Sequence, residues 1–293
     1  MILVTGAGGF IGTRVVHELR ARDRDVRALV RSPARAGTLA SWDVELVAGD
    51  VTDPASLRSA AAGCEAAVHL VSILTGSNAD FDRVMVQGTR NVVDAAREAG
   101  AGRLVLMSAI GVDAAGASGI PYFDAKREME RAVRESGLEF VILRPSFVFG
   151  DGGALRTFLR LARRAPVTPI VGDGSQRIQP VWVDDVARAV AESLERPEAA
   201  GRTLELGGPE VVTWNELWAR LKRAARVRRP SVHVPFSVMR VQATLLEKLP
   251  DPPLTRDQLR MLQAGDNVVT GEDAAAVLGL ELVALDEQLR RVA

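Results

Sequence analysis

The chain has 293 residues, 47% of them hydrophobic but only 4% aromatic, so aliphatic side chains and alanine must fill most of a full-sized core. Basic and acidic residues number 37 each, and this neutral balance gives no overall field to attract nucleic acid, so we expect no nucleic-acid partner. The single cysteine excludes an intramolecular disulfide and favours a cytoplasmic location, and no stretch reaches the roughly 18 apolar residues of a membrane-spanning helix.

The first half of the chain alternates between short β-rich runs and helical patterns. The runs that predict strands are residues 2–4, 26–30, 45–47, 67–71, 104–107 and 140–143. The helical patterns between them are residues 11–22, 54–62, 81–99 and 122–136. Such alternation predicts βαβ units that form a parallel sheet with helices on both faces. We therefore expect an α/β fold, a Rossmann-type doubly wound sheet, with residues 1–150 as its first domain.

After residue 150 the rhythm changes to turn clusters, prolines and helical patterns. The predicted helices are residues 154–164, 183–194, 214–225, 237–249 and 255–262. Thr213 and Glu216 have the spacing of a capping box for one of them. We expect residues 151–293 to form a smaller, mostly helical substrate or lid lobe over the carboxyl edge of the sheet, with residues 176–200 packing back onto the Rossmann domain. Ligands of doubly wound sheets bind at that edge.

A glycine-rich turn follows the first predicted strand and opens the first predicted helix. Residues 5–12 read Thr-Gly-Ala-Gly-Gly-Phe-Ile-Gly. Gly6 permits a tight turn, Gly9 allows close approach to a pyrophosphate, and Gly12 lets the helix pack close to the sheet. The helix N-terminus then offers N–H groups to the phosphates. We expect this turn to bind a dinucleotide through Gly6, Gly8, Gly9, Phe10, Ile11 and Gly12; the alternative is a tight turn without a ligand.

The end of the second predicted strand bears on the choice of dinucleotide. NAD-binding folds usually place an acid there, which binds the ribose 2′-hydroxyl. Here Arg31 ends the run and Arg35 follows, and guanidinium groups suit a 2′-phosphate. We therefore favour NADP(H) over NAD(H); the alternative is that both arginines are solvated loop charges. Asp50, at the end of the third strand, is expected to reach the adenine amino group.

Tyr122 and Lys126 lie four residues apart in a predicted helix and so share one face. Tyr122 is the only tyrosine, and the chain has only three lysines. A nearby ammonium favours the phenolate and should lower the pKa of the phenol. Tyr122 could then exchange a proton with a substrate oxygen while a nicotinamide carries hydride, and Lys126 could bind the nicotinamide ribose. The alternative is a pair on the helix surface without catalysis.

Together, the glycine turn and the Tyr-x-x-x-Lys pair resemble the short-chain dehydrogenase/reductase superfamily, in its extended and atypical members. Further similar stretches are residues 86–91, 143–150 and 179–187. Residues 206–210 and 254–258 resemble a subgroup that includes the nucleotide-binding accessory subunit of respiratory complex I and bacterial NAD-dependent epimerase/dehydratase-like proteins. The resemblance implies further cofactor contacts at Val51, Leu70, Val71, Ser72, Asn91, Pro145, Ser146 and Phe147. It implies Ser108 as the third catalytic group, although Ala109 and Ile110 follow where the family has its hydroxyl.

The resemblance leaves two functions open. The first is an NAD(P)-dependent oxidoreductase or epimerase/dehydratase-like enzyme that uses Tyr122 and Lys126 for acid–base chemistry on an unidentified small-molecule substrate. The second is a non-catalytic NADP(H)-binding structural, assembly or redox-sensing protein, as the complex I accessory subunit is regarded. The widely spaced histidines and single cysteine give no metal-ligand pattern.

A basic run precedes an apolar helical pattern in the second half. It consists of Arg220, Lys222, Arg223, Arg226, Arg228 and Arg229. We expect a solvated basic face beside a core or lid helix. The alternative is a peripheral contact with a membrane surface or a membrane-bound complex.

Overall fold

A seven-stranded sheet forms the centre of the computed structural model, which describes residues 1–246 and 255–292. All neighbouring strands pair in parallel, in the order β11-β6-β5-β4-β1-β2-β3. The strands are β1 (Ile2–Thr5), β2 (Val26–Val30), β3 (Glu45–Ala48), β4 (Ala66–His69), β5 (Arg103–Met107), β6 (Glu139–Pro145) and β11 (Arg202–Leu206). The predicted α/β fold of Rossmann type is confirmed.

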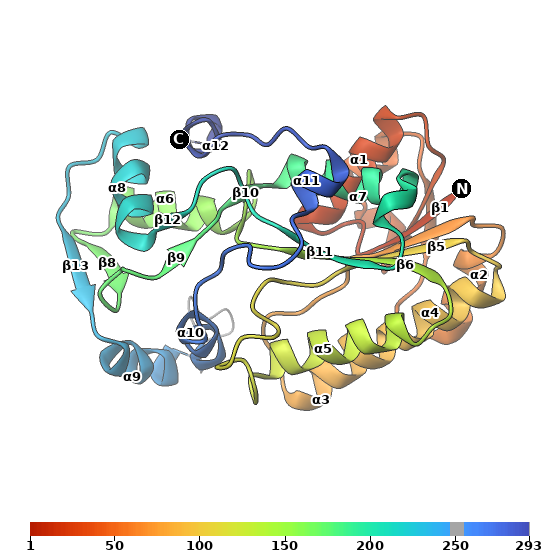
Figure 1. Ribbon diagram of the computed structural model, residues 1–293, viewed down its shortest axis with the longest axis horizontal. Helices are drawn as coiled ribbons and strands as arrows, with labels where there is room; N and C mark the ends of the chain where they lie inside the picture. The colour runs from red at the N-terminus through yellow and green to blue at the C-terminus, as the bar shows by residue number, and fades with distance from the viewer. Residues whose placement is uncertain (247–254, 293) are drawn as a thin grey trace.

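Helices cover both faces of the sheet (Figure 1). Successive side chains of β1 point to opposite faces: Val4 belongs to one apolar core cluster and Leu3 to the other. The first cluster includes side chains of α1 (Phe10–Ala21), α7 (Val183–Glu195) and α11 (Ala274–Leu278). The second includes those of α2 (Pro54–Ala61), α4 (Gly88–Glu98) and α5 (Pro121–Arg134). Burial on both faces explains why the strands read as nearly continuous apolar runs.

The predicted helix over residues 81–99 is not one regular α-helix. It begins earlier, with the short α3 (Asn78–Asp80), where Ser77 and Asp80 form a capping box. A π-helical stretch, η3 (Phe81–Gln87), then leads into α4. At this junction the Thr89 hydroxyl donates to the Met85 carbonyl at 2.6 Å. Sequence periodicity could not distinguish the wider turn from an α-turn, because both present the same apolar face.

The C-terminal lobe combines helices with three two-stranded pairs, which are β7 with β10, β9 with β12, and β8 with β13. Its strands are β7 (Val148–Phe149), β8 (Thr168–Val171), β9 (Arg177–Ile178), β10 (Val181–Trp182), β12 (Val212–Thr213) and β13 (Ser231–Val234). Its helices are α6 (Ala154–Arg164), α8 (Trp214–Ala224), α9 (Phe236–Leu246), α10 (Arg256–Gln263) and α12 (Leu285–Val292). Single 3-10 turns occur at η1 (Pro33–Arg35), η2 (Gly37–Ser41) and η4 (Pro197–Ala199).

Several expectations for this lobe can be compared with the structure. The Thr213–Glu216 capping box at the start of α8 is present. Residues 247–249 of the predicted helix 237–249 lie outside the described residues. Within the basic run, Lys222 donates to the Arg229 carbonyl, so part of that run is engaged inside the lobe. Among the described helices, none is long and apolar enough to cross a membrane.

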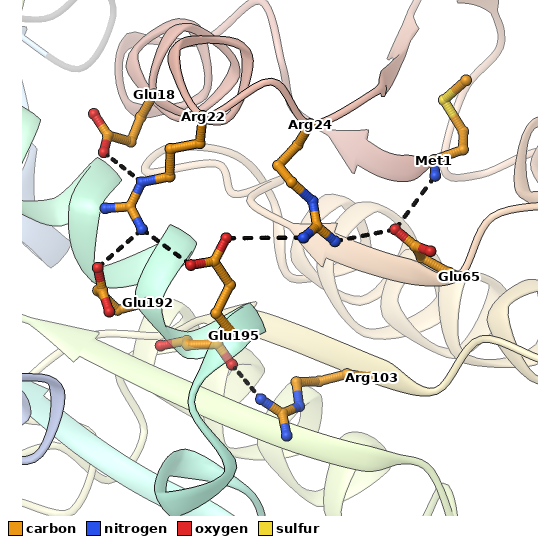
Figure 2. Close-up of polar contacts among 9 residues, drawn as sticks. Met1, Glu18, Arg22, Arg24, Glu65, Arg103, Glu192 and Glu195 are labelled. Atoms are coloured by element: carbon orange, nitrogen blue, oxygen red, sulfur yellow. Dashed lines mark hydrogen bonds and ion pairs between the residues drawn. The ribbon is translucent and has the colours of Figure 1, made fainter.

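Two segments that follow residue 150 return to the sheet. Helix α7 packs along α1, and β11 pairs with β6 as an edge strand of the sheet. The segment predicted to pack back onto the Rossmann domain, residues 176–200, therefore includes α7 but ends before β11. Figure 2 shows a chain of ion pairs across this contact. Arg22, at the end of α1, donates to Glu18, and to Glu192 and Glu195 on α7.

Candidate dinucleotide and substrate site

The glycine turn between β1 and α1 is closely packed at two of its glycines. Gly6 has φ +76°, and a Cβ at this position would lie 3.1 Å from the backbone of Leu70 and of Val71. A Cβ at Gly12 would lie 2.1 Å from the Gly6 carbonyl oxygen. A side chain at Gly12 would therefore separate the helix from the turn, as the sequence pattern predicted. The segment after β4 runs directly beside the turn.

The N-terminus of α1 is open toward solvent. Gly8 and Gly9 are exposed, and Gly9 is the residue that precedes the helix. Among the described residues, no side chain caps this helix and no acid lies in its first turn. Backbone N–H groups at such an end attract an anion. The turn therefore fits the pyrophosphate of a dinucleotide, with the N–H groups of Phe10 and Ile11 as donors.

Two aromatic side chains expected near the cofactor make contacts with the C-terminal lobe. A Cβ at Gly153 would lie 2.8 Å from the Phe10 ring, and one at Gly150 would lie 3.0 Å from it, so the ring packs on this glycine-rich loop. The Phe147 ring lies 5.5 Å from that of Trp214, within an aromatic cluster of the lobe. Both rings therefore connect the dinucleotide-binding half to the lobe.

The residues expected to contact the adenosine end of a dinucleotide lie after β2 and β3. The Asp50 carboxylate accepts hydrogen bonds from the backbone and hydroxyl of Thr52, at 2.9 and 2.8 Å. Burial raises the pKa of Asp50, but these bonds and the charges of Arg31 and Arg83 outweigh it and lower the pKa. Arg31 is exposed directly after β2. The side chain of Arg35 lies outside the described part of the structure. Arg83, whose charge also lowers the pKa of Asp50, was not predicted from the sequence. Strand and turn patterns do not show that these two residues lie close together.

Asn91 supports this end of the site. Its side-chain amide donates to the Val51 carbonyl at 2.9 Å. A Cβ at Gly88 would lie 3.0 Å from Val51, so α4 approaches this loop closely. Val51 itself is buried. The structure thus brings Asn91 to the loop that follows β3, where it fixes the backbone beside Asp50.

Tyr122 and Lys126 lie together on the buried face of α5. Lys126 donates to the Met107 carbonyl at 2.7 Å, and its Nζ lies 5.7 Å from the centre of the Tyr122 ring. Burial raises the pKa of Tyr122 to about 12, opposed by a hydrogen bond with Ser72. Burial lowers the pKa of Lys126 to about 7, opposed by the charge of Glu130. The expectation that Lys126 lowers the pKa of Tyr122 is wrong for this structure, because burial dominates both groups.

Ser108 directly follows β5 and is buried, with 3% of its surface exposed. Its hydroxyl donates to Glu130 at 2.5 Å. Glu130 is also buried and accepts two hydrogen bonds from Arg144, at 2.8 and 2.6 Å, and one from Arg134. Burial raises the pKa of Glu130, but the bonds from Arg144 and Ser108 lower it on balance. Glu130 was not expected in the site; its spacing of four from Lys126 was the available signal.

The segment after β6 is tied to the C-terminal part of the chain. Ser146 donates to the side-chain and backbone oxygens of Asn267, at 2.6 and 2.8 Å. The Asn267 amide in turn donates to the Ile110 carbonyl at 3.4 Å, and the Pro145 carbonyl accepts from the Ile110 backbone N–H at 3.0 Å. Asn267 thus joins the segments after β5 and β6, a contact that spacing in the sequence does not reveal.

The described geometry brings three features to one edge of the sheet. These are the glycine turn after β1, the segment of Leu70, Val71 and Ser72 after β4, and the Tyr122–Lys126 face of α5. The carboxyl edge of a doubly wound sheet is where dinucleotides and their substrates bind. The chain therefore has the architecture of a nicotinamide-dinucleotide-binding protein.

Comparison with known proteins identifies the family. A family model described as NAD(P)H-binding matches residues 6–197. Cinnamoyl-CoA reductase 1 of Oryza sativa subsp. japonica is 33% identical over 243 residues, which cover 71% of this chain and 71% of that protein. The (4-alkanoyl-5-oxo-2,5-dihydrofuran-3-yl)methyl phosphate reductase of Streptomyces griseus subsp. griseus is 31% identical over 277 residues, which cover 94% and 90%. This chain belongs to the NAD(P)H-binding family.

A solved structure agrees with this fold over the full chain. The NADPH-dependent quinone oxidoreductase from Escherichia coli, complexed with NADPH, superposes with a TM-score of 0.79 at 23% identity. The match covers 100% of this chain and 99% of that one. At this identity the likeness concerns the fold.

Proposed function

We propose that this protein is an NADPH-dependent reductase of a small carbonyl compound, with Tyr122 as the proton donor. The observation that carries the proposal is the Tyr122–Lys126 pair, which lies at the same sheet edge as the Gly6 turn. A pair on the helix surface without catalysis would be exposed to solvent. Here Tyr122 is only 8% exposed and Lys126 only 1% exposed. The relatives named above are reductases of carbonyl-containing or unsaturated compounds by their names, which supports this class over a non-catalytic role.

The chemistry of the proposed reaction divides between the cofactor and the chain. When bound, a reduced dinucleotide would supply hydride for the substrate carbonyl carbon and would itself be oxidised. The π electrons of the C=O bond move to the oxygen, which takes the phenolic proton of Tyr122, and water returns a proton to the phenolate. Burial lowers the pKa of Lys126 to about 7, and the negative charge of a phenolate beside it would favour the protonated ammonium. The turn from Gly6 to Gly12 and the loop at Asp50 would hold the dinucleotide.

Replacing Tyr122 with Phe tests the proposed proton transfer. The oxidation of NADPH is followed with cinnamaldehyde, ethyl acetoacetate and menadione as carbonyl probes. General acid catalysis is worth about 10²- to 10⁴-fold, so Tyr122→Phe should lower kcat at least 100-fold. Its NADPH affinity, measured by the fluorescence of the bound nucleotide, should stay within about threefold of the wild type.

Two outcomes count against the proposal. Unchanged turnover in Tyr122→Phe rules out the phenol as the proton donor. The non-catalytic alternative is favoured if the wild type binds NADPH but neither turns over any probe nor exchanges nicotinamide hydrogen.

The preference for NADPH over NADH rests on Arg31. Its guanidinium is exposed next to the loop of Asp50, where a 2′-phosphate would add a charge-assisted hydrogen bond. Such a bond is worth about 1.5–3 kcal/mol, so Arg31→Ala should weaken NADPH binding about tenfold or more and leave NADH binding nearly unchanged. Arg97→Ala, an exposed arginine of α4, is the control. Equal losses for the two nucleotides in Arg31→Ala contradict the preference.

A further inference from the structure

A carbonyl oxygen that receives hydride at its carbon becomes negatively charged and gains most from donors already pointing at it. Tyr122 supplies one such donor, and a second hydroxyl is expected beside it. Ser108 does not offer its proton in this structure, because that proton goes to the Glu130 carboxylate at 2.5 Å. Glu130 is 1% exposed and held by Arg144, so this carboxylate is a strong and permanent competitor.

Ser72 has the opposite surroundings. It is exposed, three residues beyond the end of β4, and its hydroxyl lies close enough to that of Tyr122 to oppose the rise that burial causes in the pKa of Tyr122. Among the described residues, this hydroxyl donates to the Met85 thioether, at 3.9 Å. A thioether is a weak acceptor, so an incoming oxygen can readily take the Ser72 proton.

The backbone places Ser72 close to both halves of the site. Leu70 and Val71, which precede it, lie 3.1 Å from the position of a Cβ at Gly6. The dinucleotide turn, Ser72 and Tyr122 therefore lie one after another in space along one edge of the sheet. A substrate oxygen bound between Ser72 and Tyr122 would lie next to the dinucleotide-binding turn.

We propose that the Ser72 hydroxyl, together with that of Tyr122, binds the substrate carbonyl oxygen, in the role that the family resemblance assigned to Ser108. This inference rests on the proposed reductase function. Ser72 is then a catalytic residue, because it touches the reacting oxygen. Ser108 is a structural partner of Glu130, which fixes the end of β5 to α5.

The unique tyrosine allows a test that does not depend on turnover. Isotope labelling of tyrosine gives one Cζ resonance, that of Tyr122, in the full-length protein. With NADP⁺ bound, addition of cinnamaldehyde, ethyl acetoacetate or menadione should shift this resonance for at least one probe. The shift should be lost in Ser72→Ala and kept in Ser72→Thr, which retains the hydroxyl. Thr75→Ala, which removes an exposed hydroxyl of the same loop, should behave as the wild type.

Steady-state kinetics with NADPH and the same probes provide the second readout. Loss of one donor to a developing oxyanion lowers kcat by about 10²- to 10³-fold, so Ser72→Ala should lose about 100-fold in kcat/KM. Ser72→Thr should recover to within about tenfold of the wild type. Because this inference assigns the Ser72 hydroxyl to the substrate and not to the cofactor contact implied by the family resemblance, NADPH affinity should be unchanged in both variants, which separates this effect from damage to the dinucleotide site.

The outcomes distinguish this inference from the proposed function. Two results overturn the role of Ser72 but leave the reductase function intact. In the first, turnover by Ser72→Ala stays within threefold of the wild type. In the second, Ser108→Ala lowers turnover more than Ser72→Ala does. A Ser72-dependent shift without turnover of any probe supports the binding role and overturns the reductase. If the wild type shows no shift of the Tyr122 resonance and no turnover of any probe, both the role of Ser72 and the reductase function are overturned.

Discussion

Space around individual glycines differs sharply within the dinucleotide turn. At Gly12 a Cβ would overlap the Gly6 carbonyl oxygen, at 2.1 Å. At Gly8 no heavy atom of the described residues lies within 4 Å of a Cβ. The contact at Gly12 is with backbone, which cannot move aside without separating α1 from β1. The two glycines therefore serve different purposes, although they stand four residues apart in one motif.

This difference predicts unequal effects of the same substitution. Gly12→Ala should lower the free energy of unfolding by about 1–3 kcal/mol, the usual range for forcing extra atoms into a packed site. Gly8→Ala should change it by less than about 0.5 kcal/mol, as for an exposed position. Urea denaturation without dinucleotide measures both. Equal stabilities of the two variants would show that the close approach at Gly12 is not needed for folding.

At the scale of elements, the contact between α1 and α7 holds the returning segment on the sheet. The buried side chains of α7 include Val186 and Val190, and those of α1 include Val15 and Val16. Polar groups add to this contact at its edge, where Arg22 of α1 joins two glutamates of α7 (Figure 2). Burial of both apolar faces is the larger contribution, and the ion pairs fix the register of the two helices.

The Arg22 contacts can be compared with a solvated pair on α5. Arg22 is 25% and Glu192 19% exposed, whereas Arg131 and Glu128 are 56% and 40% exposed. Double-mutant cycles to Ala should give a coupling of about 1 kcal/mol for Arg22 with Glu192, and about 0.3 kcal/mol for Arg131 with Glu128. Thermal unfolding at low salt provides the free energies. Coupling of equal size in the two pairs would contradict a role for Arg22 in fastening α7.

For the whole molecule, the sheet is completed only by chain from beyond residue 150. Strand β11 covers the edge of β6, and α7 and α11 cover one face of the sheet together with α1. The C-terminal segment also reaches back to the site through Asn267 and Ser146. The dinucleotide-binding half is therefore a continuous structure in space but not in sequence.

This arrangement predicts that residues 1–150 do not fold alone. Such a fragment would leave the apolar surface beneath α7 and the hydrogen-bonding edge of β6 exposed to water. Its urea denaturation, followed by circular dichroism, should lack the cooperative transition of the full-length protein. A cooperative transition in the fragment, with NADPH bound at the affinity of the full chain, would show that the returning segments are dispensable.

Features that depend on neighbouring residues could be predicted from the amino-acid sequence alone. The alternation of strand and helix periods predicted the parallel sheet. The spacing of Gly6, Gly9 and Gly12 predicted the turn, and the spacing of Tyr122 and Lys126 predicted one helix face. Each of these follows from backbone geometry within about one helical turn or strand, and local patterns encode such geometry directly.

Contacts between groups that lie far apart in the chain could be identified only from the folded structure. Ser108 lies 22 residues from Glu130, and their pairing removes from Ser108 the proton that the family pattern would use. Ser72 approaches Tyr122 from the segment after β4, and burial, not the charge of Lys126, raises the pKa of Tyr122. Such contacts have no periodicity in the sequence, because they arise where separately formed elements pack at the carboxyl edge of one sheet.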